Sequence, residues 1–179
     1  MSEKIVVLMA HSDIDNSILN KRIKCELESK NNVLYKDLSS LYKDFQIDIK
    51  QEQNDLLDAT KIIFQFPMYW YSAPSMLKRW VDEVLSYGYS YEIDKNGEFQ
   101  ALALKDKEFQ MIVTTGAGEE SFIGKDRLSV KECLNSYSYT AKMLGMKEKE
   151  AFLIYGAAYK EFSKNDLDQI ASDVVKHVL

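Results

Sequence analysis

The sequence contains few of the residues that build disulfide frameworks or metal sites. Its 179 residues include only two cysteines, two histidines and two prolines. Cys25 and Cys133 each fall within a segment predicted to be helical, so we expect two reduced thiols rather than a disulfide. Two histidines cannot build a multi-histidine metal site, and we expect no metal.

Clusters of positive charge and long apolar runs are also missing. The 28 acidic residues outnumber the 23 basic ones and give a net charge of −5, which argues against nucleic acid as the main partner. No apolar run approaches the roughly 20 residues that span a bilayer. Because the first residues have no signal-peptide layout, we expect a cytoplasmic protein.

Apolar residues make up 46% of the chain, which suits a packed core and one domain over residues 1–179. Strand-like runs alternate with segments of helical periodicity, which predicts an α/β protein with a parallel sheet and right-handed crossovers. Pro74 suits the first position of one helix, and Gly88 suits its left-handed end. Two long loops are expected, 38–50 and 87–106, the second with a turn at 95–97. The predicted strands are 4–10, 32–37, 61–66, 108–115 and 151–157, and the predicted helices are 17–28, 51–59, 74–85, 129–144 and 163–178.

The most informative stretch follows the third predicted strand, where the chain reads Pro67, Met68, Tyr69, Trp70 and Tyr71. Aromatic rings on a turn at the end of a buried strand need something flat to pack against, and α/β proteins bind ligands at such strand ends. We interpret this loop as a platform for a flavin ring, with backbone N–H groups facing the ring's nitrogens and carbonyl oxygens. The alternative is that these aromatics pack a subunit interface, and both interpretations can hold.

Two further loops leave the same edge of the predicted sheet. The loop after the first strand carries His11 and leads to Ser17 at a helix N-terminus, where free N–H groups and the helix dipole can hold a phosphate. Taken alone, Ser17 is equally consistent with a plain helix cap, and His11 with a structural hydrogen bond. The loop over residues 114–117 offers two hydroxyls and a close backbone approach at Gly116. Neither a P-loop nor a Gly-x-Gly-x-x-Gly motif occurs.

Together these three loops resemble the flavodoxin-like NAD(P)H:quinone oxidoreductase family. Its short bacterial members include general stress proteins, modulators of drug activity and ancillary subunits of glutathione-gated potassium efflux systems. The resemblance covers nearly the whole chain, and it implies a doubly wound five-stranded parallel sheet in the order 2-1-3-4-5, with helices on both faces. It rests on Ala10-His11-Ser12, Ser17 to Asn20, Asp48-Ile49, Glu52-Gln53, Phe66 to Tyr71, Pro74, Leu77-Lys78, Trp80-Val81-Asp82, the tyrosine-rich segment and Thr114-Thr115-Gly116.

The resemblance also implies a flavin, either FMN or FAD, with NAD(P)H as co-substrate. By motif match, one group of residues would contact the phosphate end, a second would line the ring, and a third would close its other edge. Two tyrosines, often from a partner subunit, and one phenylalanine would belong to the acceptor pocket. The phosphate contacts would be His11, Ser17, Ile18 and Leu19, and the ring would be lined by Pro67, Met68, Tyr69, Trp70 and Tyr71. The other edge would be closed by Thr114, Thr115, Gly116 and Ala117. The acceptor pocket would include Tyr89, Tyr91 and Phe122.

The sequence departs from the family at two positions. Ala117 stands where the family often has a second glycine. Phe122 occupies the place of a tyrosine that, in some members, is proposed to stabilise charge together with a histidine, and a phenyl ring cannot donate a hydrogen bond. We therefore nominate no catalytic side chain, and expect backbone groups or Lys125 to take that role.

The resulting hypothesis is a flavoenzyme that passes two electrons by ping-pong hydride transfer from NAD(P)H to a quinone-like acceptor. The number of aromatics near the site predicts a homodimer. One alternative is a redox-sensing ancillary subunit of a membrane potassium efflux transporter. Another is a flavodoxin-type electron carrier, although the loop after the first strand lacks the Ser/Thr-Gly phosphate pattern expected there.

Overall fold

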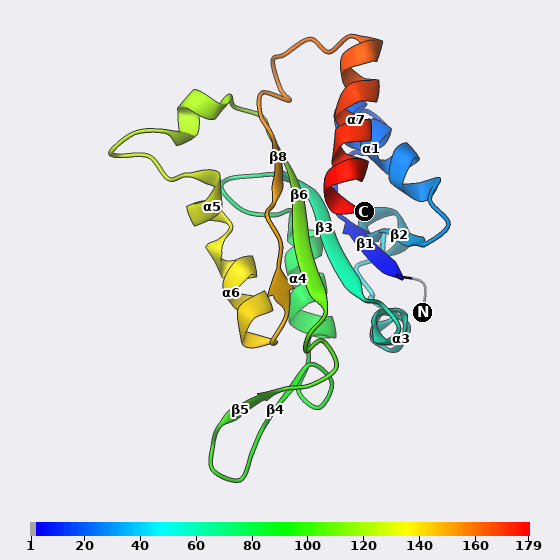
Figure 1. Ribbon diagram of the computed structural model, residues 1–179, viewed down its shortest axis with the longest axis vertical. Helices are drawn as coiled ribbons and strands as arrows, with labels where there is room; N and C mark the ends of the chain where they lie inside the picture. The colour runs from blue at the N-terminus through cyan, green and yellow to red at the C-terminus, as the bar shows by residue number, and fades with distance from the viewer. Residues whose placement is uncertain (1–2) are drawn as a thin grey trace.

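A six-stranded parallel sheet forms the centre of the molecule in the computed structural model, which describes residues 3–179 (Figure 1). The order is β2-β1-β3-β6-β7, and β8 also pairs with β6. Because all these pairs are parallel, the strands end at one common edge, which we call the carboxyl edge. The strands are β1 (Ile5–Met9), β2 (Val33–Asp37), β3 (Lys61–Met68), β6 (Glu108–Thr115), β7 (Lys147–Glu148) and β8 (Phe152–Ile154).

Helices cover both faces of the sheet and bury its side chains. α1 (Ile18–Glu28) and α7 (Lys164–Val178) pack together on one face, over residues such as Val7 and Ile63. The opposite face is covered by α3 (Ile49–Leu57), α4 (Ser75–Val84) and α6 (Asn135–Met143), around Phe64. Successive strand residues point to opposite faces, so Ile63 and Phe64 belong to different cores. This two-faced burial explains why the strands read as continuous apolar runs.

The strand order implied by the resemblance is confirmed, with differences in detail. Strands β2, β1, β3 and β6 match the first four places of the order, and β7 and β8 together occupy the fifth place beside β6. The predicted strand 151–157 is shorter than expected and ends at Ile154. Gly156 adopts a positive φ of 83° and turns the chain away from the sheet.

The predicted helix over 129–144 is in fact two helices, because the chain leaves helical geometry at Leu134 (φ −95°, ψ 2°). α5 (Val130–Cys133) begins with the predicted capping box, in which Ser129 and Glu132 bond reciprocally. α6 ends where expected, in a Schellman motif at Gly145 (φ 68°). A short additional helix, α2 (Leu38–Leu41), occupies the start of the loop predicted over 38–50.

The predicted helix 74–85 differs from α4 by one residue at each end, but the roles predicted for Pro74 and Gly88 were wrong. Pro74 is the N-cap of α4 rather than its first helical residue, with an extended backbone (φ −55°, ψ 149°). Leu85 has a ψ of 58° and ends the helix after Val84. Gly88 therefore does not terminate α4. Its φ of 80° instead serves a turn in which its N–H donates to the carbonyl oxygen of Tyr91 at 2.8 Å.

The long segment between α4 and β6 forms a hairpin of β4 (Tyr91–Ile93) and β5 (Phe99–Ala101). The predicted turn at 95–97 is confirmed, since Gly97 has a φ of 82° and its N–H donates to Asp94 O at 2.9 Å. Figure 1 shows the hairpin extending from the end of the sheet opposite the carboxyl edge. Because of that placement, the hairpin lies far from the carboxyl edge of its own chain.

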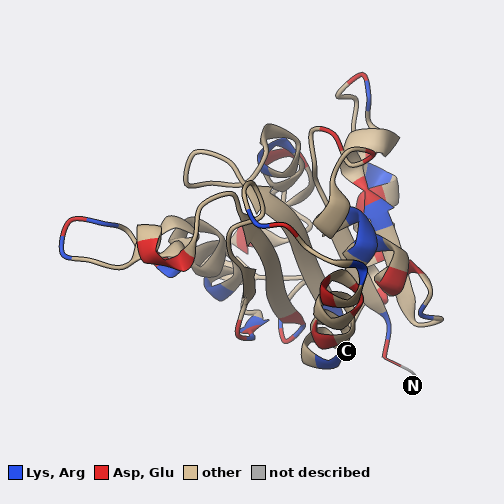
Figure 2. Cartoon of the chain, turned by 90° about the horizontal axis from the view of Figure 1, so that it is seen from above, with Lys and Arg blue, Asp and Glu red and all other residues tan. Residues whose placement is uncertain are grey.

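Charged residues lie mainly on the helices and loops that surround the sheet, while the middles of β1, β3 and β6 carry none (Figure 2). Within residues 3–179, no helix combines the length and apolar character needed to cross a bilayer. Cys25 is exposed on α1 and Cys133 is half-buried on α5, and both thiols are free.

Candidate functional site

A cleft of about 670 Å³ opens at the carboxyl edge of the sheet, within the range typical of small-molecule sites. The loops after β1, β3 and β6 contribute to it, as predicted for strand ends in an open parallel sheet. A fourth segment, after β8, completes the wall. The lining residues are His11, Ser12, Asp13, Asn16, Ser17, Ile18, Leu19, Asn20, Pro67, Met68, Tyr69, Thr114, Gly116, Ala157, Ala158, Lys160, Glu161 and Phe162.

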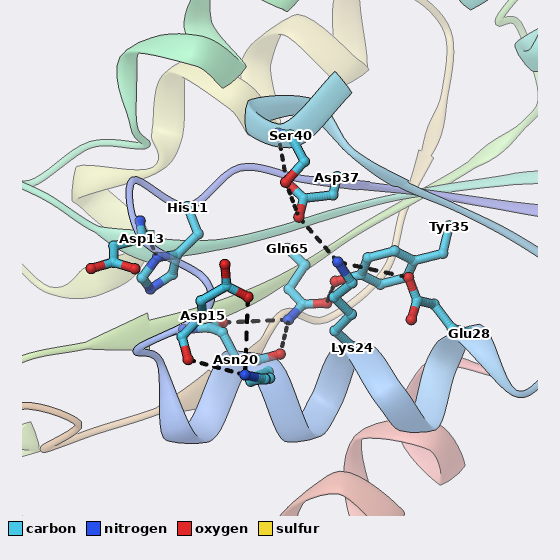
Figure 3. Close-up of polar contacts among 11 residues, drawn as sticks. His11, Asp13, Asp15, Asn20, Lys24, Glu28, Tyr35, Asp37, Ser40 and Gln65 are labelled. Carbon is cyan, nitrogen blue, oxygen red and sulfur yellow. Dashed lines mark hydrogen bonds and ion pairs between the residues drawn. The ribbon is translucent and has the colours of Figure 1, made fainter. Parts of the chain in front are cut away.

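In the loop after β1, His11 lies beside Asp13 (Figure 3), and a hydrogen bond between them defines the tautomer of the His11 ring. The main-chain N–H of Asp13 donates to Nδ1 of His11 at 3.0 Å, so Nδ1 must be an acceptor and the ring hydrogen must be on Nε2. Burial lowers the pKa of His11, and the negative charges of Asp13 and Asp37 only partly offset that effect. His11 therefore presents a neutral ring to the cleft, with Nε2–H as its donor.

The start of α1 forms the wall beside His11. Ser17 is the N-cap, and its hydroxyl oxygen accepts the N–H of Asn20 at 3.3 Å. The first helical residues, Ile18 and Leu19, line the cleft, and their N–H groups have no partner within the helix. With the Ser17 oxygen engaged, its hydroxyl hydrogen is available to the cleft. This wall therefore offers donors and the positive end of a helix dipole.

The loop after β3 is a tight two-residue turn with an unusual backbone. Tyr69 and Ser72 exchange hydrogen bonds of 2.8 and 3.0 Å, and the two residues between them, Trp70 and Tyr71, have φ values of 47° and 64°. Such turns ordinarily use Asn and Gly, because side chains with a Cβ are strained at positive φ. Trp70 is 94% exposed and Tyr71 is 57% exposed. Strain of this kind, kept without a packing benefit inside the chain, is typical of functional sites.

The predicted residues of the β3 loop divide between the cleft and its rim. Pro67, Met68 and Tyr69 line the cleft, and the Tyr69 hydroxyl lies 2.9 Å from the Ser12 hydroxyl, which joins two loops across the opening. Trp70 and Tyr71 stand at the rim with their rings in solvent. Three of the five residues predicted for the platform thus line the cleft, whereas Trp70 and Tyr71 do not line it in the single chain.

The loop after β6 places one hydroxyl at the cleft and uses the other for structure. Thr114 lines the cleft, whereas the Thr115 hydroxyl donates to the carbonyl oxygen of Ala117 at 2.8 Å. The carbonyl oxygens of Thr115 and Ala117 then accept N–H groups from the segment after β8. A Cβ at Gly116 would lie 3.3 Å from the Cβ of Ala158, so glycine permits this close approach.

Tyr89, Tyr91 and Phe122, predicted for the acceptor pocket, lie away from the cleft in the single chain. The Tyr89 hydroxyl donates to Gln53 O at 2.9 Å, and burial raises its pKa to about 12. Tyr91 stacks on Phe99 in the hairpin, with ring centroids 4.9 Å apart. Phe122 packs against the ring of Tyr155 at 5.9 Å.

Sequence reasoning missed two parts of the site. Asn20, in the first turn of α1, lines the cleft and bonds to Thr114, although it was not among the predicted contact residues. The segment after β8 contributes Lys160 and Phe162, and the strand-end rule applied to the fifth strand would have found it. Lys160 is the only lysine or arginine among the lining residues. Within residues 3–179, no group of three or more His, Cys, Asp or Glu side chains is arranged to hold a metal.

Comparison with known proteins shows similarity along nearly the whole chain. The profile of a family described as flavodoxin-like fold matches residues 3–178. The chain is 33% identical over 177 residues to the uncharacterized NAD(P)H oxidoreductase YrkL of Bacillus subtilis (strain 168), covering 98% of this chain and 97% of that protein. It is 35% identical over 156 residues to the glutathione-regulated potassium-efflux system ancillary protein KefG of Pectobacterium carotovorum subsp. carotovorum (strain PC1), covering 86% and 82%. The crystal structure of general stress protein 14 from Treponema denticola, in complex with FMN, matches with a TM-score of 0.84 at 27% identity and covers 97% of this chain and 96% of that one.

Proposed function

Because the chain belongs to the flavodoxin-like fold family, we propose that it is an FMN-dependent NAD(P)H oxidoreductase with a quinone-like acceptor. The observation that carries the proposal is the hydrogen-bond polarity of the cleft. His11 Nε2–H, the Ser17 hydroxyl and the N–H groups of Ile18 and Leu19 are all donors on one wall. A ligand that satisfies them must be rich in acceptors, as a phosphate is.

Several other residues that line the cleft also suit FMN. Its phosphate would be held at the start of α1, with Lys160 as the nearby cation among the lining residues. Its ring would lie toward Pro67, Met68 and Tyr69, where main-chain groups and an aromatic side chain are available. Thr114 and Gly116 would close the opposite edge. We propose FMN rather than FAD because a relative 27% identical in sequence was solved in complex with FMN.

When bound, FMN would supply the redox chemistry, taking a hydride from NAD(P)H and passing two electrons to the acceptor. The chain's own residues would bind and orient. The donors on α1 would fix the phosphate, and the strained turn at Trp70 and Tyr71 would present main-chain N–H groups and aromatic surface at the mouth of the cleft. Phe122 cannot donate a hydrogen bond, so the charge-stabilising role of the tyrosine found in some relatives would fall to main-chain donors. A cytoplasmic location, where NAD(P)H is available, is part of the proposal.

We further propose that two copies of the chain form the working enzyme. The rim of the cleft exposes Trp70 and Tyr71, while the β4–β5 hairpin, which begins at Tyr91 and closely follows Tyr89, extends from the opposite end of the same chain (Figure 1). A roof made by hairpin tyrosines must therefore come from a second copy. Light scattering on the purified protein should give twice 20.7 kDa, and a monomer at micromolar concentration would exclude the dimer.

An absorbance spectrum followed by anaerobic titration tests the proposed activity. The purified protein, reconstituted with FMN, should show flavin bands that NADPH or NADH bleaches and that an added quinone restores. A protein that binds neither FMN nor FAD would refute the flavoprotein assignment. A bound flavin that neither nicotinamide reduces would refute the oxidoreductase assignment while leaving the site intact.

A second candidate function is that of an ancillary subunit of a potassium efflux transporter. The similarity to KefG, at 35% identity over 86% of this chain, favours it. The two functions are compatible, since a transporter subunit can also bind a flavin. Affinity purification of the tagged chain from detergent-solubilised membranes of its own source should recover a transporter of this class. Recovery of the chain alone would count against this function.

A further inference from the structure

A buried chain of polar side chains runs beneath the cleft and ends at Thr114. Gln65, on β3, is completely buried, and its amide lies between the Tyr35 hydroxyl and Asn20 (Figure 3). Gln65 Oε1 is 2.8 Å from the Tyr35 hydroxyl, and Gln65 Nε2 is 3.2 Å from the main-chain oxygen of Asn20. Asn20 Nδ2 in turn lies 3.0 Å from Thr114 Oγ1. These contacts link β2, β3, α1 and β6 in one line.

The direction of every hydrogen bond in this series of side chains follows from one carbonyl group, the main-chain oxygen of Asn20. The main-chain oxygen of Asn20 can only accept, so the Gln65 amide must turn its nitrogen toward it. Gln65 Nε2 is also 3.4 Å from Asn20 Oδ1, so the Asn20 amide places its oxygen toward Gln65 and its nitrogen toward Thr114. Gln65 Oε1 is left as an acceptor, which the Tyr35 hydroxyl fills.

These directions determine the role of Thr114, the last side chain in the hydrogen-bonded series. Asn20 Nδ2 can only donate, so Thr114 Oγ1 accepts and its own hydrogen must point elsewhere. Among residues 3–179, Asn20 is the one side-chain partner that the structure gives this hydroxyl. Thr114 lines the cleft but is only 1% exposed, so its hydroxyl meets the cleft through a small part of its surface. A buried donor without a partner is costly, which favours a ligand that supplies an acceptor.

We infer that Gln65 is a positioning residue that acts through Asn20 to make Thr114 a hydrogen-bond donor to the bound ligand. The ligand must then present a carbonyl oxygen, ring nitrogen or hydroxyl oxygen above Thr114, in addition to the phosphate held at α1. This inference rests on the proposed function, since FMN is the ligand that offers both. Gln65 does not line the cleft, so its effect on binding must travel through the two residues that do.

A double-mutant cycle with FMN as the probe tests the inference. Thr114→Val removes the hydroxyl at constant shape and should weaken FMN binding roughly threefold to tenfold, as loss of one neutral hydrogen bond does. Thr114→Ser keeps the hydroxyl and should bind like the unmodified chain. In the Q65M background, Asn20 can turn its oxygen toward Thr114 and capture the hydroxyl hydrogen. Thr114→Val should then change the dissociation constant by less than about twofold.

Asn20→Asp provides an independent background in case Q65M does not fold. A carboxylate still accepts from Gln65 and keeps the shape of the side chain, but it has no N–H for Thr114 and would draw the threonine hydrogen inward. Thr114→Val should again have almost no effect. A full threefold to tenfold effect of Thr114→Val in either background, at unchanged melting temperature, would overturn the inference. Failure of the unmodified chain to bind FMN would instead refute the proposed function, so the two failures are distinguishable.

Discussion

The indole Nε1–H of Trp80 donates to Oε2 of Glu52 at 2.9 Å, and Glu52 is completely buried. The same carboxylate accepts the Tyr42 hydroxyl and pairs with Lys36 Nζ at 2.8 Å. A buried charge is stable only when its hydrogen-bonding capacity is filled, as it is here. The cluster joins α3, α4, β2 and the end of the α2 segment. It therefore anchors the helix that follows the strained turn at the mouth of the cleft.

Glu52→Ala should lower the free energy of unfolding by about 2–4 kcal/mol, because the Trp80 Nε1–H and the Tyr42 hydroxyl lose their partner, while Lys36 keeps its ion pair with Asp55. Urea denaturation of the variant measures the loss. Glu92→Ala, on the exposed hairpin, is the control and should change stability by less than about 0.5 kcal/mol. A loss for Glu52→Ala below about 1 kcal/mol would show that the cluster is not an anchor.

Two Tyr→Phe substitutions should have opposite effects on stability. The Tyr42 hydroxyl donates to Glu52, so Tyr42→Phe should destabilise the protein by about 1–3 kcal/mol. The Tyr137 hydroxyl is buried and has no hydrogen-bond partner among residues 3–179, so Tyr137→Phe should leave stability unchanged or raise it by up to about 1 kcal/mol. Thermal unfolding of both variants and of the unmodified chain at one pH measures these two changes in stability. Destabilisation of both by the same amount would contradict the assignment of the Tyr137 hydroxyl as unsatisfied.

The lowered pKa of His11 predicts a pH dependence of stability in the FMN-free protein. The unfolded chain has a histidine pKa of about 6.5, so between that value and the lower folded value the unfolded state binds the extra proton. Stability should therefore fall as the pH drops below about 6.5, and His11→Asn should remove part of this fall. Denaturation midpoints at pH 7.5 and 5.5 give the comparison, with His177→Asn as the control. Equal losses in the unmodified chain and His11→Asn would refute the role of His11.

The positive φ values of Trp70 and Tyr71 should lower the stability of the protein. Replacing Trp70 and Tyr71 together by Asn and Gly, the residues preferred at positive φ, should raise the free energy of unfolding by about 1–2 kcal/mol or more. Little packing is lost, since Trp70 is 94% exposed. Tyr87→Asn, an exposed tyrosine with ordinary φ, is the control and should not stabilise. If the double variant is less stable than the unmodified chain, the rings contribute packing that the single chain does not reveal.

The convergence of three loops on one cleft could be predicted because it depends only on strand order. Parallel strands end at one edge, so His11, Pro67 and Thr114 had to be neighbours once the strands were recognised. The positive φ of Trp70 could not be predicted, since bulky residues rarely adopt it and local preference points elsewhere. The link between Gln65 and Asn20 joins residues 45 positions apart, so only the packing of α1 on β3 reveals it. The break between β7 and β8 likewise depends on pairing with β6 rather than on the run of apolar residues.

Ser17 and Ser163 offer a matched pair for testing the phosphate site. Each serine is the N-cap of a long helix, and each hydroxyl accepts a main-chain N–H three residues ahead. Only Ser17 lines the cleft. Ser→Ala at either position should therefore cost about 0.5–2 kcal/mol of stability through the lost cap. Only Ser17→Ala should also weaken FMN binding, by roughly threefold to tenfold for one hydrogen bond.

Riboflavin, which lacks the phosphate, separates the cap from the ligand contact. If the Ser17 hydroxyl donates to phosphate, Ser17→Ala should weaken binding of FMN but leave binding of riboflavin unchanged. Fluorescence titrations of both flavins against the unmodified chain, Ser17→Ala and Ser163→Ala measure this. A similar loss for FMN and riboflavin would mean that Ser17 only shapes the start of α1. Loss of FMN affinity in Ser163→Ala as well would show that general destabilisation, rather than a contact to phosphate, accounts for the effect.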